Sequence, residues 1–148
     1  MNNQSSALKL GHRNVKYLFT SFDKFIDLVV SDNDDEMCVT ENWINDDQTA
    51  TVVQIPGLKF IHMDRVRRGG GVGIYIRQHI PSKQLFDDFV PPDRSRYKIS
   101  LCIVYRAPSS SVVLFVDYLD SVLSFIASQY DYICLLGDIN VGFMHDLT

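Results

Sequence analysis

The chain of 148 residues lacks the features that would place it in a membrane or in a secretory pathway. No apolar run approaches the roughly 20 residues that a membrane-spanning helix needs, so we expect no membrane partner. The first six residues are polar and lack the basic and then apolar plan of a secretory signal. We therefore expect an intracellular protein, nuclear or cytoplasmic.

Cysteine is scarce, and its spacing excludes two further classes. The three cysteines are Cys38, Cys102 and Cys134, and no two of them form a CxxC pair. An odd number without that spacing argues against a disulfide framework and against a zinc site. Each cysteine sits in an apolar run, which predicts a small, buried and free thiol.

The sequence also lacks a phosphate-binding loop. Its glycine cluster, RRGGGVG at 67–73, has no GK[ST] after it, and an apolar strand pattern follows where a helix would be needed. This excludes a nucleotide-binding module, and we expect no small-molecule cofactor. A tight turn into a strand is the better interpretation.

Composition and charge indicate one globular domain over residues 1–148 with an uneven surface. A net charge of −4 gives no overall signature of nucleic-acid binding. Between Lys59 and Lys83, however, Asp64 is the only acid among six basic residues. This basic strip is either a track for a phosphate backbone or an ordinary solvated surface. The candidates for nucleic-acid contact are Arg65, Arg67, Arg68 and, further along the chain, Arg106.

Hydrophobic periodicity predicts strands that alternate with helices, and so an α/β fold in layers. The stretch 81–96 is the least regular, and Pro108 to Ser111 predicts a turn with a helix cap. The predicted strands are 8–17, 37–40, a strand near 51–55, 60–63, 72–76, 99–105 and 132–136, and the predicted helices are 18–30 and 112–126.

Polar side chains follow three of the apolar strands, where layered α/β folds gather their ligands. They are Glu41, Tyr105, and Asp138 with Asn140. Asp138 and Asn140 are two positions apart, so in extended backbone they would point to the same side. Glu41 offers the hard oxygen that Mg²⁺ prefers. By spacing alone, a strand-end aspartate such as Asp138 is as readily a turn former or a helix cap.

Five ordered blocks resemble one family. LGHRNV, CVTENW, RRGGGVGIYI, VYRAPSSS and LLGDINV look like the apurinic-endonuclease-like nuclease of jockey-type non-LTR retrotransposons, within the endonuclease/exonuclease/phosphatase superfamily. The resemblance covers nearly the whole chain. It implies a four-layered α/β sandwich with mixed sheets flanked by helices, present here in part. It also implies DNA as partner and cleavage of DNA phosphodiesters with Mg²⁺ or Mn²⁺.

The resemblance assigns roles to five residues. Glu41 matches a metal-binding glutamate, and Asn14 matches an asparagine beside metal and phosphate. Tyr105 matches a tyrosine that hydrogen-bonds the scissile phosphate. Asp138 matches the aspartate that orients or deprotonates the attacking water, with Asn140 as its companion on the phosphate.

The chain also departs from the family. A closing Ser-Asp-His block is absent, and His145 and Asp146 lie too close to Asp138 to replace it. We therefore expect a C-terminally truncated nuclease domain, a phosphodiesterase by descent that is inactive as this chain. An uncovered sheet face would favour self-association. The alternative is a non-catalytic remnant that binds nucleic acid or another partner.

Overall fold

The computed structural model describes residues 7–16, 18–44, 52–63, 70–82, 84–85 and 99–140. The chain divides into two compact units, Met1–Ser82 and Lys83–Thr148. In these ranges neither of the two α-helices is long and apolar enough to cross a membrane. The single domain expected over residues 1–148 stays a prediction.

The first unit is built on a mixed sheet of four strands in the order β1-β2-β4-β3. β1 runs parallel to β2, whereas β4 is antiparallel to both of its neighbours, β2 and β3. Because β1 and β2 are parallel, their carboxyl ends meet at one edge of the sheet. The elements of this unit are β1 (Leu10–Asn14), the 3₁₀ turn η1 (Leu18–Ser21), α1 (Phe22–Asp32), β2 (Glu36–Thr40), β3 (Leu58–Met63) and β4 (Val72–Arg77).

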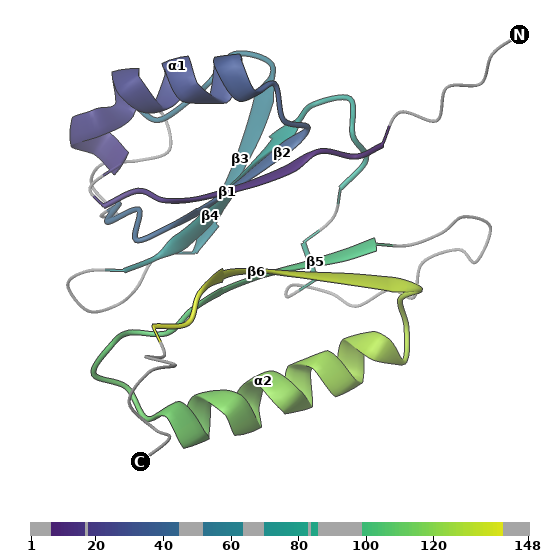
Figure 1. The fold of residues 1–148 in the computed structure, drawn as a ribbon. Helices are drawn as coiled ribbons and strands as arrows, with labels where there is room; N and C mark the ends of the chain where they lie inside the picture. The colour runs from purple at the N-terminus through teal and green to yellow at the C-terminus, as the bar shows by residue number, and fades with distance from the viewer. Residues whose placement is uncertain are drawn as a thin grey trace, which may run out of the picture. The chain divides into compact units, whose positions relative to one another are not determined.

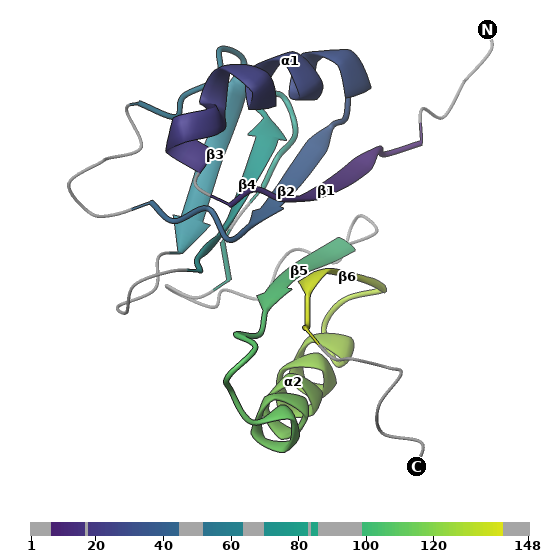
Figure 2. The same ribbon diagram turned by 60° about the vertical axis from the view of Figure 1, so that its left-hand side comes forward.

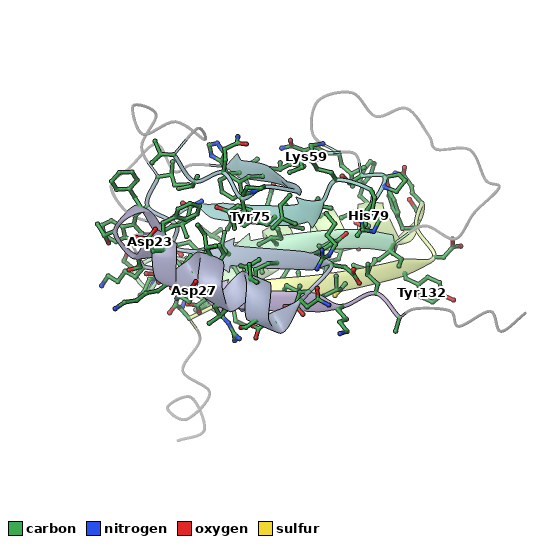
Figure 3. The ribbon with its side chains drawn as sticks, turned by 90° about the horizontal axis from the view of Figure 1, so that it is seen from above. Asp23, Asp27, Lys59, Tyr75, His79 and Tyr132 are labelled. Atoms are coloured by element: carbon green, nitrogen blue, oxygen red, sulfur yellow. The ribbon has the colours of Figure 1, made fainter. Side chains whose placement is uncertain are left out.

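Helix α1 covers one face of this sheet and forms the core with it (Figures 1 and 2). Phe25 on α1 lies 5.4 Å from the ring of Tyr75 on β4, and Phe60 stacks on Tyr75 at 4.3 Å. The hydroxyl of Tyr75, which Figure 3 labels, donates a hydrogen bond of 2.9 Å to the carbonyl of Val53. The helix ends at Asp32, and the next residue, Asn33, has a left-handed backbone (φ 51°) that is a common stop signal.

The second unit pairs two parallel strands with one long helix. They are β5 (Ile99–Tyr105), α2 (Val112–Ala127) and β6 (Tyr132–Asp138), and α2 lies along the pair (Figures 1 and 2). The side chain of Ser111 accepts a hydrogen bond of 3.3 Å from the amide of Leu114, so the predicted cap is confirmed. The parallel pairing brings the carboxyl ends of β5 and β6 together.

The expected α/β fold class is confirmed, with a mixed sheet and helices against the strands. The strand predicted near 51–55 is wrong over its described part, because residues 52–55 form turns and loop. Val53 and Ile55 are nevertheless buried, which explains the misleading apolar pattern. All three cysteines are free as predicted, but only Cys38 is fully buried.

Candidate active site

Asn14 and Glu41 meet at the edge of the first sheet. Asn14 is the last residue of β1 and pairs in register with Thr40, the last residue of β2. Glu41 follows directly, and the side-chain amide of Asn14 donates a hydrogen bond of 3.3 Å to its Oε1. The parallel register therefore joins two candidates that lie 27 positions apart in the sequence.

The backbone holds Glu41 in a strained conformation. Glu41 and Trp43 have positive φ angles of 55° and 51°, which residues with a Cβ rarely adopt. Their amides donate to the carbonyls of Gly71 and Gly70, at 2.9 and 3.0 Å. Gly70 and Gly71 lead into β4 and support the segment that carries Glu41. The tight turn predicted for the glycine cluster lies partly outside the described residues and stays a prediction.

Asn42 locks this segment into the fold. Its side chain has no exposed area, and its backbone carbonyl accepts a hydrogen bond of 3.1 Å from the amide of Leu18. Gly71 has a φ of 88°, and a Cβ added there would overlap Oδ1 of Asn42. Only glycine therefore leaves room for the buried side chain of Asn42 at this position.

Lys16 and Trp43 follow closely after Asn14 and Glu41 in the sequence. Each lies two positions beyond a member of the Asn14–Glu41 pair, and the ammonium of Lys16 stands 6.0 Å from the centre of the Trp43 ring. A cation at this separation is attracted by the π-electrons of the indole ring. The Lys16 ammonium therefore packs against the Trp43 ring.

Tyr105, Asp138 and Asn140 come together in the second unit. Tyr105 and Asp138 are register partners at the ends of β5 and β6. Asn140 does not continue the strand, because its φ is 46°. The extended-backbone argument for its orientation is therefore wrong. The contact arises instead from a turn in which the amide of Asn140 donates a hydrogen bond of 3.0 Å to Oδ1 of Asp138.

Because Gly137 has no side chain, it lets β5 and β6 approach each other closely just before Asp138. It pairs with Val104 in the β5–β6 register and has a φ of 145°. A Cβ at this position would collide with the backbone carbonyl of Val104. The close approach of the two strands places Asp138 directly opposite Tyr105.

Arg106 is buried rather than extended towards solvent. It is 4 % exposed, and its guanidinium donates to the carbonyls of Ala107, Ser110, Ile139 and Asn140. The side-chain amide of Asn140 in turn donates a hydrogen bond of 2.9 Å to the carbonyl of Arg106. A nucleic-acid contact by Arg106 stays a prediction, and this burial does not favour it.

Comparison with protein-family models and with curated proteins finds no match. Solved structures do match. A 3′ phosphatase from Neisseria bound to a product DNA hairpin is 20 % identical with a TM-score of 0.62. An AP endonuclease from Archaeoglobus fulgidus is 16 % identical with a TM-score of 0.67. Each match covers 91 % of this chain and 58 % of the other.

The fold is that of these DNA-processing enzymes. At these identities the likeness concerns the fold, which is the one that the sequence blocks implied. The chain spans little more than half of either matched protein.

The oxygen donors at the Asn14–Glu41 edge suit a hard divalent cation. Mg²⁺ is commonly bound by one or two carboxylates, with waters and substrate phosphate completing its shell. Glu41 supplies one carboxylate, and the hydrogen bond from Asn14 holds it. No three His, Cys, Asp or Glu side chains gather into a metal site within the described parts of the chain. The residues present therefore fit a cation that takes few protein ligands.

The basic strip is described only in part. Arg65, Arg67 and Arg68 lie outside the described residues. Lys59 is exposed on β3 (Figure 3). Arg77 donates a hydrogen bond of 2.6 Å to Oδ1 of Asn33, and it lies 3.6 Å from a carboxylate oxygen of Asp35. Its side chain therefore stabilises the loop between α1 and β2. The nucleic-acid contacts of Arg65, Arg67 and Arg68 remain predictions.

Sequence reasoning missed three residues that support the candidates, Asn42, Gly71 and Gly137, and it gave Arg106 a different role. Two of them left a signal. A glycine just before Asp138, inside an otherwise apolar strand, is typical of a close backbone approach. The glycine cluster before β4 carried the same signal.

Proposed function

We propose that this chain carries the chemistry of a divalent-metal-dependent DNA endonuclease. The observation that carries the proposal is the backbone at Glu41 and Asn140. Both residues were selected from sequence blocks alone, and both adopt left-handed backbone just beyond a strand end. For Glu41 this backbone costs about 1–3 kcal/mol, and strain of this kind clusters at functional sites. Asparagine adopts the same backbone at a lower cost, so Asn140 adds its position beside Asp138 and little strain. The fold shared with two DNA-processing enzymes supports the same reading.

The residues divide the work of phosphodiester hydrolysis. A Mg²⁺ or Mn²⁺, when bound, would supply positive charge to offset the charge that develops on the phosphate. Glu41 would hold this cation, and Asn14 would keep the carboxylate in place. The Tyr105 hydroxyl would donate a hydrogen bond to a phosphate oxygen. Asp138 would accept a proton from the attacking water, and Asn140 would fix the Asp138 carboxylate through its amide.

Phosphoryl transfer suits such a set of groups, because it needs positioning and charge neutralisation more than covalent catalysis. The proposed substrate is DNA, since the matched Neisseria enzyme is bound to a DNA hairpin. The more specific proposal is target-site nicking for a retrotransposon. Coding sequence for a reverse transcriptase beside this one in the genome would support that origin, and a gene flanked only by unrelated host genes would contradict it.

A plasmid-nicking assay tests the proposed chemistry. Supercoiled DNA is incubated with the 148-residue chain in Mg²⁺ or in EDTA, beside Glu41→Gln, Asp138→Asn and an Asp23→Asn control on α1. Any nicking by this chain should need Mg²⁺, survive in the control and fall at least 100-fold in the other two variants, as for removal of a group that stabilises the transition state. A chain that is inactive, as the missing closing block predicts, would show no nicking at all. Nicking that persists in both variants or in EDTA would overturn the assignment.

A wild-type chain that binds DNA without cutting it favours the alternative, a nucleic-acid-binding remnant. We also propose that the chain associates with itself, and sedimentation over a range of concentrations measures this association.

A single-domain chain should also unfold in one cooperative transition. Two separate transitions for the two units would contradict that organisation.

A further inference from the structure

The guanidinium of Arg106 connects two loops of the second unit. Its Nε donates a hydrogen bond of 2.7 Å to the carbonyl of Ile139, and a terminal nitrogen donates to that of Asn140. The other terminal nitrogen donates to the carbonyls of Ser110 at 2.5 Å and Ala107 at 3.2 Å. One side chain therefore ties the loop after β5 to the turn after β6.

The backbone of Arg106 makes the connection reciprocal. Its amide donates a hydrogen bond of 2.9 Å to the carbonyl of Asp138. Its carbonyl accepts the hydrogen bond from the side chain of Asn140. Arg106 thus contacts each of the three residues from 138 to 140, and it fixes both the backbone and a side chain of the candidate site.

The chemistry of the side chain explains why an arginine stands here. A buried cation is costly unless its donors are satisfied, and the planar guanidinium offers five N–H donors in a fixed fork. Carbonyl oxygens from two directions match that fork. An ammonium is a compact point charge with three donors on a flexible stem, so lysine cannot hold both loops in the same geometry.

We propose that Arg106 is a positioning residue that sets the geometry of Asp138 and Asn140 and does not itself contact DNA. The proposal rests on the proposed function for the role of those two residues in the reaction. The sequence made Arg106 a candidate for contact with nucleic acid. In this proposal Arg106 instead supports the residues of the candidate site.

The positioning itself is measured without any activity. In the wild type, the Nε proton of Arg106 and the side-chain amide protons of Asn140 should exchange slowly by NMR, because both are hydrogen-bonded. Arg106→Lys should speed the exchange of the Asn140 protons at least tenfold, while amides within α1 keep theirs. Fast exchange of the Nε proton in the wild type would overturn the proposal, even if the variant does not fold. Unchanged exchange at Asn140 in a folded variant would do the same.

Kinetics then separate positioning from mere stability. Nicking is measured well below the melting temperature for Arg106→Lys and for Arg13→Lys. Arg13 lies in an exposed ion pair with Asp32 at 3.0 Å, so its substitution is a control for the same chemical change. We expect kcat to fall 10- to 100-fold in Arg106→Lys only, with KM and the salt dependence of DNA binding unchanged.

Each result of these experiments indicates a different role for Arg106. A salt slope that falls by about one in Arg106→Ala would make Arg106 a phosphate contact and overturn the proposal. An unchanged kcat in folded Arg106→Lys would leave it a stabilising residue only, which also overturns it. If the wild type does not nick DNA, the proposed function fails, and the exchange of the Asn140 amide protons still decides whether Arg106 positions that residue.

Discussion

The side-chain amide of Asn14 donates to Oε1 of Glu41 across 3.3 Å, and so it links the ends of two parallel strands. The pair forms because β1 and β2 are in register up to Asn14 and Thr40. A carboxylate held by a neighbouring amide keeps its orientation for a cation without losing its charge.

The first prediction concerns metal affinity at this pair. Glu41→Gln retains an acceptor for Asn14 but removes the charge, so Mn²⁺ affinity should fall at least tenfold. Asn14→Ala keeps the charge and loses only the orientation, so we expect a smaller loss. Calorimetric titration with Mn²⁺ measures both, with Asp27→Asn on α1 as control. Equal affinity in Glu41→Gln and the wild type would show that the cation binds elsewhere.

The second prediction compares two glycines that share a left-handed backbone. Gly71 has a φ of 88° and Gly57 one of 82°, but an added Cβ meets Asn42 only at Gly71 and open space at Gly57. Gly57→Ala should lower the free energy of unfolding by about 1–2 kcal/mol through backbone strain. Gly71→Ala should cost about 1–3 kcal/mol more through overpacking. Urea unfolding of both variants measures the difference, and equal losses would show that Asn42 does not restrict this position.

The third prediction is a pH dependence from Tyr75. Burial raises the pKa of Tyr75 above its ordinary value of 10.0. The unfolded chain therefore loses this proton first, so the contribution is complete below pH 10 and declines above it by about 1.4 kcal/mol per pH unit. Tyr75→Phe loses the hydrogen bond to Val53, about 1 kcal/mol at neutral pH.

Urea unfolding of the wild type and Tyr75→Phe at pH 8 and pH 11 tests this dependence. The stability advantage of the wild type should shrink or reverse at the higher pH. The exposed Tyr118 provides the control, because Tyr118→Phe should change stability equally at both values. A constant advantage of the wild type over Tyr75→Phe would contradict the prediction.

The fourth prediction concerns the basic strip. If Arg65, Arg67 and Arg68 contact phosphates, replacing all three by glutamine should reduce the slope of log K against log salt by about 2–3 for duplex DNA. Gel-shift titrations at several salt concentrations measure that slope. Lys24→Gln on α1 is the control for lost charge. An unchanged slope would make the strip an ordinary solvated surface.

The regular elements could be predicted from sequence because their periodicity is strong. Ile99–Tyr105 is observed with the predicted bounds, and the helix predicted over 112–126 ends one residue later. The strand near 51–55 failed because Val53 and Ile55 are buried from a loop, and a pattern of burial alone resembles a strand. Burial is a tertiary property, so periodicity cannot separate the two cases.

The candidate site could also be predicted only in part, because its contacts depend on the folded chain. The blocks selected Asn14 and Glu41, but their contact depends on the parallel register of β1 and β2. Arg106 was a candidate for nucleic-acid contact, but it is buried, which is unusual for arginine and which no pattern in the sequence indicates. Its carbonyl partners around Ser110 and Asn140 are set by the turns of the folded chain, and no local pattern encodes them.

Glu41 has a left-handed backbone that suits glutamate poorly, so the residue found at this position in related sequences reports whether the carboxylate is still under selection. Glycine or asparagine would fit a φ of 55° with less strain, and either would make the fold more stable. A lineage that no longer needs the carboxylate should therefore drift towards those residues at this position. Glutamate retained among related copies, against that gain in stability, would mean that the chemistry is still being used.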